Sequence, residues 1–194
     1  ARLMAALGAV RCTRFVLIST VDVFAEPRGV DEATPVAERG LHPYGLHRRQ
    51  LEQFVETRFP GALIVRLPGL VGPGLRKNVL FDALHDHQVE RIDSRGVFQF
   101  YPMVNLWSDI CTAMAHELPL LHLTAAPLSV GEVFAHGFGR PLQQALSAEP
   151  ARYDLRTRHA RAFGAEGDYQ YTARESLLAI RAYAQSEPQR SQPA

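Results

Sequence analysis

The sequence predicts an α/β protein with a mostly parallel sheet, and three observations support this class. Continuous apolar runs such as VLIST and ALIVRL suit strands that are buried on both faces. Segments with apolar residues at helical spacing separate these runs. Strand and helix alternate through the first half of the chain, which is typical of parallel α/β sheets, whereas the second half is more mixed.

The first half contains the clearest elements. A short opening helix precedes the strand TRFVLIST. Residues 25–43 are rich in Pro, Gly, Asp and Glu and are expected to form a loop. Pro43 suits the first position of a helix that extends to Phe59. Pro60 and Gly61 are then expected to end this helix before the strand ALIVRL.

The second half is expected to start with a loop, PGLVGPGLRKN, and a helix from Val79 to His87. VFQFYP alternates like an exposed or edge strand, and LLHLTA and ARYDLRTR are further strand candidates. An amphipathic helix from Leu106 to Leu118 contains Trp107, which is expected to pack in the core or to line a pocket. Two capping boxes are expected to start later helices: Ser129 with Glu132, and Thr172 with Glu175.

Composition excludes several function classes. The chain has 194 residues, is 46% hydrophobic and carries a net charge of +1, so neither a nucleic acid nor a membrane surface is an expected partner. No apolar run reaches the roughly 18 residues of a membrane span. Cys12 and Cys111 have no metal or redox spacing, which indicates a reducing cytoplasm, and no metal is expected.

The chemistry-bearing residues are a hydroxyl pair, a phenol and a fixed cation. Ser19 and Thr20 end a buried strand, where open α/β sheets bind ligands. Tyr44 and Arg48 lie one helical turn apart, so the guanidinium faces the phenol and favours its ionised form. Together these groups could move a proton to or from a substrate oxygen. On spacing alone, however, the simpler explanation is favoured, in which Tyr44 opens a helix and Arg48 is its solvated neighbour.

Three ordered motifs, VLISTVDVF, YGLHRRQLE and ALIVRLPGLVGPG, resemble the core of the extended short-chain dehydrogenases/reductases, the NAD-dependent epimerase/dehydratase family. The resemblance implies a partial Rossmann-like parallel sheet with a smaller mixed α/β C-terminal substrate region. It also implies NAD or NADP as cofactor and a nucleotide-activated sugar as small-molecule substrate. Thr20 stands at the catalytic hydroxyl, Tyr44 at the catalytic acid/base and Arg48 at the lysine position, and Tyr44, Arg48 and Pro68 are expected to contact the cofactor.

Three departures separate this chain from the family pattern. Arg48 keeps the charge of the family's lysine but cannot release a proton, and its planar fork differs from a point ammonium. Gly69 and Val71 replace an asparagine and a tyrosine at the substrate position, and Arg76 and Lys77 are the better candidates for substrate phosphate. The glycine-rich cofactor loop does not precede the first strand, so roughly 90 residues, or three βα units, are expected to be missing.

These observations predict three regions. Residues 1–74 are expected to form the C-terminal half of a dinucleotide-binding domain, and 75–185 a substrate-binding region with returning sheet elements. Residues 186–194 lack apolar side chains and are expected to be a disordered tail. The predicted function is that of an NAD(P)-dependent epimerase, dehydratase or reductase acting on a secondary alcohol or ketone. Two alternatives are a non-catalytic cofactor or metabolite sensor, and an interaction module, such as a homodimer, that pairs through an exposed sheet edge.

Overall fold

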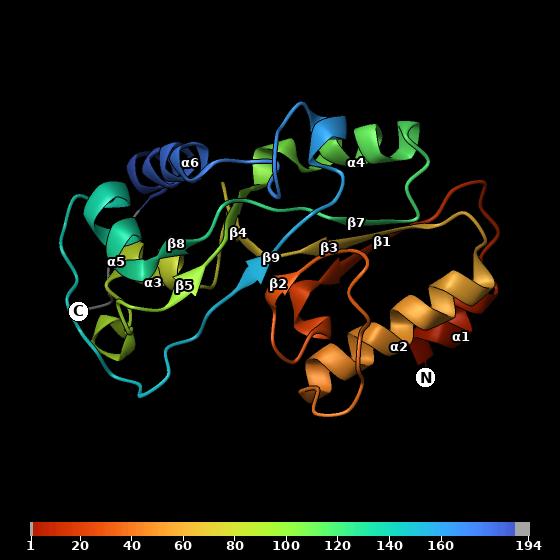
Figure 1. The fold of residues 1–194 in the computed structure, drawn as a ribbon, viewed down its shortest axis with the longest axis horizontal. Coiled ribbons are helices and arrows are strands. Elements are labelled where there is room, and N and C mark those ends of the chain that lie inside the picture. The colour runs from red at the N-terminus through yellow and green to blue at the C-terminus, as the bar shows by residue number, and fades with distance from the viewer. Residues whose placement is uncertain (1, 189–194) are drawn as a thin grey trace.

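A parallel three-stranded sheet lies at the centre of the computed structural model, which describes residues 2–188 (Figure 1). Its strands follow the order β1 (Val16–Thr20), β3 (Leu63–Leu67) and β7 (Leu120–His122). β3 pairs in parallel with both neighbours, which leaves β1 at one edge. The expected strands VLIST and ALIVRL are therefore confirmed as neighbours in one parallel sheet.

Helices cover both faces of this sheet. α1 (Arg2–Gly8) and α2 (Pro43–Arg58) pack on one face, against an apolar cluster that includes side chains of β1 and β3. α4 (Leu106–Ala115) packs on the other face, against side chains of β3 and β7. Because a parallel sheet needs an apolar layer on each side, this three-layer arrangement accounts for the buried character of the strands.

Local sequence fixes both ends of α2. Pro43 occupies its first turn, and the ring of His42 accepts a hydrogen bond from the Tyr44 amide at 3.4 Å. The helix ends at Arg58, ahead of Pro60, as expected. Its buried face includes Leu51 and Val55, which pack against the sheet.

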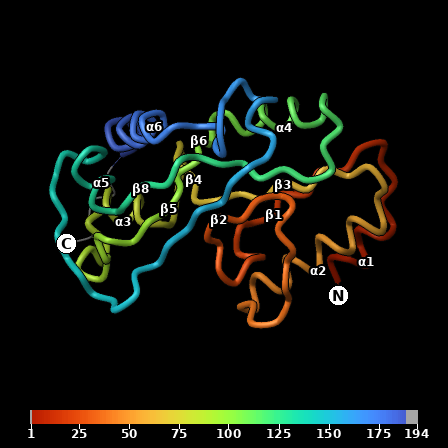
Figure 2. The backbone as a smooth tube through the Cα atoms, in the orientation of Figure 1, coloured from red at the N-terminus to blue at the C-terminus, as the bar shows by residue number. Residues whose placement is uncertain are grey.

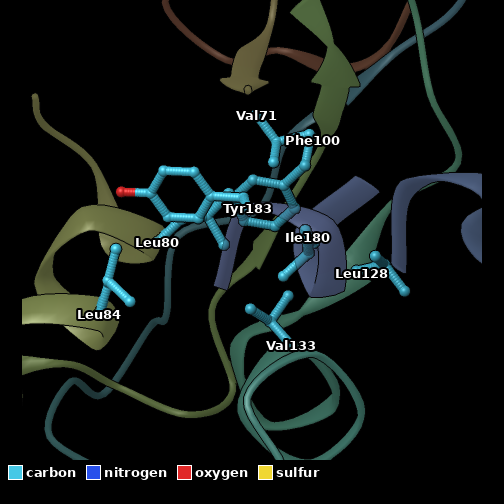
Figure 3. Packing of buried hydrophobic residues seen from close by; sticks show 8 residues of the cluster. All are labelled: Val71, Leu80, Leu84, Phe100, Leu128, Val133, Ile180 and Tyr183. Atoms are coloured by element: carbon cyan, nitrogen blue, oxygen red, sulfur yellow. The ribbon is translucent and has the colours of Figure 1, made fainter. Parts of the chain in front are cut away.

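A second apolar cluster builds the other lobe of the molecule (Figure 3). It gathers α3 (Val79–His85), α6 (Ala173–Ser186) and a short helix pair, α5 (Val130–Glu132) with a π-helical turn at Val133–Gly137. Both expected capping boxes start helices here, one at α5 and one at α6. The buried side chains of this cluster are Val71, Leu80, Leu84, Phe100, Leu128, Val133, Ile180 and Tyr183.

Three pairs of short strands lie outside the central sheet. Figure 2 follows the chain from the π-helical turn back toward the sheet, where it runs beside the segment after β1. The pairs are β2 (Arg28–Val30) with β9 (Asp154–Leu155), β4 (Gly69–Val71) with β6 (Phe100–Pro102), and β5 (Val97–Phe98) with β8 (Leu128–Ser129).

These strand pairs correct three expectations. The loops expected at 25–43 and at PGLVGPGLRKN contain β2 and β4, which depend on partners far along the chain. VFQFYP is not one alternating strand, because β5 and β6 pair with different partners and all of β6 is buried. Between them, the side chain of Gln99 donates to the carbonyls of Ala125 at 2.6 Å and Leu155 at 2.7 Å.

Two expected helices end early, and one expected segment lies partly outside the described residues. α3 ends at His85 because Asp86 adopts a left-handed conformation with φ 50°. α4 ends at Ala115 rather than Leu118. Of the tail expected at 186–194, Ser186 is the last residue of α6, and residues 189–194 are outside the described range. The remaining short turns are 3₁₀ helices at Val21–Val23, Val89–Arg91, Met103–Asn105 and Ala160–Phe163.

Candidate functional site

Tyr44 and Arg48 lie together on α2, beside the end of β1. The Tyr44 side chain is 46% exposed, and the guanidinium carbon of Arg48 lies 5.4 Å from the centre of its ring. This is a cation–π contact between residues one helical turn apart. Nη1 of Arg48 also donates to the carbonyl oxygen of Ile18 in β1 at 3.3 Å. The expected proximity of phenol and cation is therefore present, and the phenol is accessible from solvent.

Thr20 forms a tight turn immediately after β1. Its hydroxyl accepts a hydrogen bond from the Asp22 amide at 3.2 Å and donates to the Asp22 carboxylate at 3.0 Å. This turn packs directly on the first turn of α2, because a Cβ atom placed on Gly45 would lie 1.9 Å from the Asp22 carbonyl oxygen. Only glycine permits so close an approach, so Gly45 allows the first turn of α2 to lie against the Thr20 turn.

Asp22 is a site residue that sequence reasoning did not identify. Its carboxylate is only half-buried and is hydrogen-bonded to the candidate catalytic hydroxyl. A carboxylate at this position is a second group that could accept a proton from a bound ligand. The available signal was local: a Thr-x-Asp sequence at the end of a strand is able to form this type of side-chain turn.

The two candidate hydroxyls, Ser19 and Thr20, have different surroundings in the structure. Ser19 and Thr20 are both buried, with 5% and 8% of their surface exposed, and strand alternation places their side chains on opposite faces. The Ser19 hydroxyl donates to the Glu52 carboxylate at 2.6 Å, inside the protein. The expectation that Ser19 takes part in catalysis is therefore not supported by its geometry, and Thr20 stays the candidate catalytic hydroxyl.

The expected cofactor and substrate residues lie in different places. Pro68 is buried and follows β3, whose last residue pairs with Thr20, so it belongs to the same end of the sheet. Gly69 starts β4, where a Cβ atom would lie 2.6 Å from the Gln99 carbonyl oxygen, so close strand packing explains this glycine. Arg76 and Lys77 are exposed in the loop between β4 and α3.

A surface groove with a volume of about 420 Å³ runs beside the Tyr44–Arg48 pair. Leu3 and Met4 of α1 and Leu51 of α2 give it an apolar lining, and the phenol and guanidinium stand at its side. A larger depression of about 570 Å³ lies between α3, the π-helical turn and α6, on the other lobe. We assign the site to the smaller groove because the phenol of Tyr44 and the guanidinium of Arg48 both line it.

Solved structures share the fold of this chain. No protein-family profile and no curated protein matches it. A mutant of UDP-glucuronic acid 4-epimerase from Bacillus cereus, in complex with UDP-4-deoxy-4-fluoro-glucuronic acid and NAD, superimposes with a TM-score of 0.68 at 14% identity. TunA, an NAD-dependent NDP-hexosamine 5,6-dehydratase, gives 0.67 at 19% identity, and RMD from Pseudomonas aeruginosa, complexed with NADPH, gives 0.63 at 22% identity.

The extent of these matches is uneven. They cover 94%, 96% and 95% of this chain but 64%, 68% and 70% of the epimerase, TunA and RMD chains, respectively. At such identities the likeness establishes the fold. The Rossmann-like α/β fold implied by the resemblance to NAD-dependent epimerases and dehydratases is thus confirmed, and this chain spans about two thirds of the matched enzymes.

Proposed function

We propose that this chain supplies the catalytic and substrate-binding part of an NAD(P)-dependent epimerase/dehydratase-like oxidoreductase. Its substrate would be a secondary alcohol or ketone on a nucleotide-activated sugar. The observation that carries the proposal is that Arg48, stacked on the Tyr44 ring, is hydrogen-bonded to β1, and Thr20 stands at the carboxyl end of that strand. In open α/β sheets this is the end where ligands bind. The fold supports the proposal because proteins that share it were solved with NAD, NADPH or a UDP-sugar analogue.

The three side chains would divide the proton chemistry. Tyr44 would take the hydroxyl proton when the alcohol is oxidised and return it when the ketone is reduced. Arg48 would stabilise the phenolate by its fixed charge, while Thr20 would hold the substrate oxygen by a hydrogen bond. Because Arg48 cannot relay a proton, the partly exposed Tyr44 would exchange its proton with solvent directly.

The residues at hand fit one end of a nicotinamide cofactor. Tyr44, Arg48 and Pro68 would hold its nicotinamide and ribose, and the bound cofactor would supply or accept the hydride. The apolar groove beside Tyr44 has room for a flat ring, and Arg48 has further N–H groups for ribose hydroxyls. A glycine-rich phosphate loop is not part of this sequence, so this chain contributes nothing of that kind to the pyrophosphate.

Asp22 bears on the type of reaction. Epimerisation needs only the reversible transfer of a hydride and a proton. Dehydration also needs a base that removes the proton next to a carbonyl, while the hydroxyl on the neighbouring carbon takes up a proton and leaves as water. The Asp22 carboxylate, hydrogen-bonded to Thr20 at 3.0 Å, would be that base. We therefore place dehydration beside epimerisation as the two reactions that this site supports.

Binding without turnover is the second candidate function. One observation favours it: the Arg48 guanidinium, at the position of the family's lysine, is hydrogen-bonded to the Ile18 carbonyl. In that case the site would sense a cofactor or metabolite. Ile18 is 37% exposed on the edge strand β1. Because an exposed strand edge can pair with another chain, we also propose that two copies could pair there.

The compartment belongs to the proposal as well. Within residues 2–188, no helix has the length and apolar character to span a bilayer. Cys12 and Cys111 are both free thiols, which fits a reducing compartment. On the basis of these thiols, we propose that the protein lies in the cytoplasm.

The test of substrate binding uses UDP-glucuronic acid with the chain itself. Isothermal titration calorimetry should detect binding, and replacing Arg76 and Lys77 together by alanine should weaken it by about tenfold or more, since charge-assisted bonds to phosphate would be lost. Arg91→Ala is the matched control, because Arg91 is an exposed arginine in the turn after α3. Absence of UDP-glucuronic acid binding, or equal weakening by the control, would refute the assignment of substrate.

A further inference from the structure

A buried chain of charged and polar side chains runs beneath the candidate site. Glu52 of α2 has no exposed surface, and its carboxylate is held by two hydrogen bonds from Arg66 of β3, at 3.0 and 2.8 Å. Ser19 of β1 donates to the same carboxylate at 2.6 Å, and Arg49 donates at 3.0 Å. Burial opposes ionisation of Glu52, but the hydrogen bonds and charge of Arg66 outweigh it and hold the pKa of Glu52 below its ordinary value.

This series of polar side chains continues across the sheet to β7. Nη1 of Arg66 lies 3.2 Å from Nε2 of His122, and Nδ1 of His122 lies 3.0 Å from the carbonyl oxygen of Arg156. Because a carbonyl oxygen only accepts, Nδ1 carries the proton and Nε2 accepts from Arg66. His122 is therefore neutral, and it links the Glu52–Arg66 pair to the segment at 156–158.

A second carboxylate holds this segment from the other side. Glu32, in the connection between β2 and α2, accepts hydrogen bonds from the His122 amide at 2.8 Å and the Thr157 hydroxyl at 2.7 Å. It also accepts from the Arg158 amide at 2.9 Å. The segment 156–158 is thus tied to β7 both through the His122 ring and through Glu32.

Stability alone does not explain such a network. A buried ion pair contributes little net stability, because desolvation of the charges offsets their attraction. The apolar contacts of Leu51 and Val55 already hold α2 on the sheet, but apolar contacts are non-directional and do not fix its position along the strands. The directional hydrogen bonds that Glu52 accepts from Ser19 and Arg66 do fix that position.

We propose that Glu52 is a positioning residue that sets the register of α2 on β1, and so the placement of Tyr44 and Arg48 beside Thr20. Glu52 lies eight residues after Tyr44, about 12 Å along the helix, so it acts through the helix rather than on the reacting atoms. Through Arg66 and His122 the same constraint reaches the segment 156–158. The inference rests on the proposed function of the site.

The test replaces the ion pair by apolar groups of similar volume, Glu52→Leu with Arg66→Met, since such a change can keep a protein folded. Amide hydrogen exchange is followed by NMR in the first turns of α2, at Leu46 and Arg48, relative to Val65 in β3. We expect exchange at Leu46 and Arg48 to rise at least tenfold relative to Val65. A crystal structure of the variant should show that the contact from Arg48 to the Ile18 carbonyl is lost.

Glu56→Leu is the matched control. It removes a half-exposed carboxylate from the same helix and breaks only its 3.2 Å pair with Arg49, so the exchange ratio should stay at the wild-type value. A folded double variant with a wild-type ratio and an intact Arg48–Ile18 contact would overturn the proposal. If the Arg158 amide of the double variant keeps its wild-type protection from exchange, the part of the proposal that concerns residues 156–158 is overturned.

A third variant keeps the proposal testable if the double variant does not fold. Ser19→Ala removes one hydrogen bond and leaves the Glu52–Arg66 pair in place, and it should raise the same exchange ratio about threefold. An unchanged ratio would count against the proposal. None of these readouts uses a nucleotide sugar or a cofactor, so failure of the positioning role and failure of the proposed function are distinguishable.

Discussion

The contact between Gly45 and the Asp22 turn gives the sharpest prediction about the site. In Gly45→Ala, the added Cβ atom would lie 1.9 Å from the Asp22 carbonyl oxygen, where an ordinary contact begins at 3.4 Å. Either the turn after β1 or the first turn of α2 must therefore move by about 1.5 Å, because the atom that is met belongs to the backbone. Overpacking of this kind costs about 1–3 kcal/mol of folding free energy.

Because Tyr44 directly precedes Gly45 on α2, the same displacement would shift Tyr44 relative to the turn that Thr20 and Asp22 form. A misplacement of about 1 Å in an active site lowers a rate by roughly 100-fold, so activity of the complete protein should fall by at least that factor. Urea unfolding followed by circular dichroism measures the stability change. Gly8→Ala is the control, because Gly8 ends a helix and its Cβ atom would meet nothing within 4 Å. If Gly45→Ala unfolds at the same urea concentration as Gly8→Ala, the close approach inferred here does not exist.

Three further predictions concern the phenol, the guanidinium and the buried histidine. In the complete protein, Tyr44→Phe should lower turnover on the order of 100-fold or more while ligand binding persists; a rate within twofold of wild type would remove Tyr44 from proton transfer. Arg48→Lys should preserve turnover because it keeps the charge, whereas Arg48→Met should lower it about tenfold; equal rates for the two variants would show that the charge has no catalytic role. Burial lowers the pKa of His122 to about 4, from an ordinary 6.5. The unfolded chain therefore binds more protons between these values, so the free energy of unfolding should decrease as the pH falls from about 6.5 to about 4. Urea unfolding across this pH range should show that the free energy of unfolding depends less on pH in His122→Gln than in the wild type. The same pH dependence in both proteins would refute a lowered pKa of His122.

Much of the fold follows from local sequence patterns. VLIST and ALIVRL are apolar throughout, and Pro43 and Pro60 mark the limits of α2, so these elements need no information from distant residues. The strands β2 and β4 have only three residues each and form because β9 and β6 lie beside them. No periodicity in so short a segment distinguishes a strand from a loop. Trp107, expected to pack or to line a pocket, is 70% exposed, so amphipathic spacing alone did not predict its environment.

The candidate site shows a similar division. Tyr44, Arg48 and Thr20 were predicted from spacing and from the family resemblance, and the structure brings α2 against the end of β1 at these residues. Ser19 and Thr20 both carry a hydroxyl and both are buried, so only the hydrogen bond from Ser19 to Glu52 shows which hydroxyl is already engaged by another element. Asp22 was missed because its importance comes from a turn geometry that places its carboxylate on Thr20.

The most direct test of the central claim is whether the sugar of a bound nucleotide sugar approaches Tyr44. UDP-glucuronic acid would be added to the chain, and NMR would record nuclear Overhauser effects between its hexose protons and the Tyr44 ring, with Tyr44→Phe used to assign that ring among six tyrosines. We expect contacts from the hexose protons to the Tyr44 ring. Binding of UDP-glucuronic acid with hexose contacts only to other parts of the chain would contradict it.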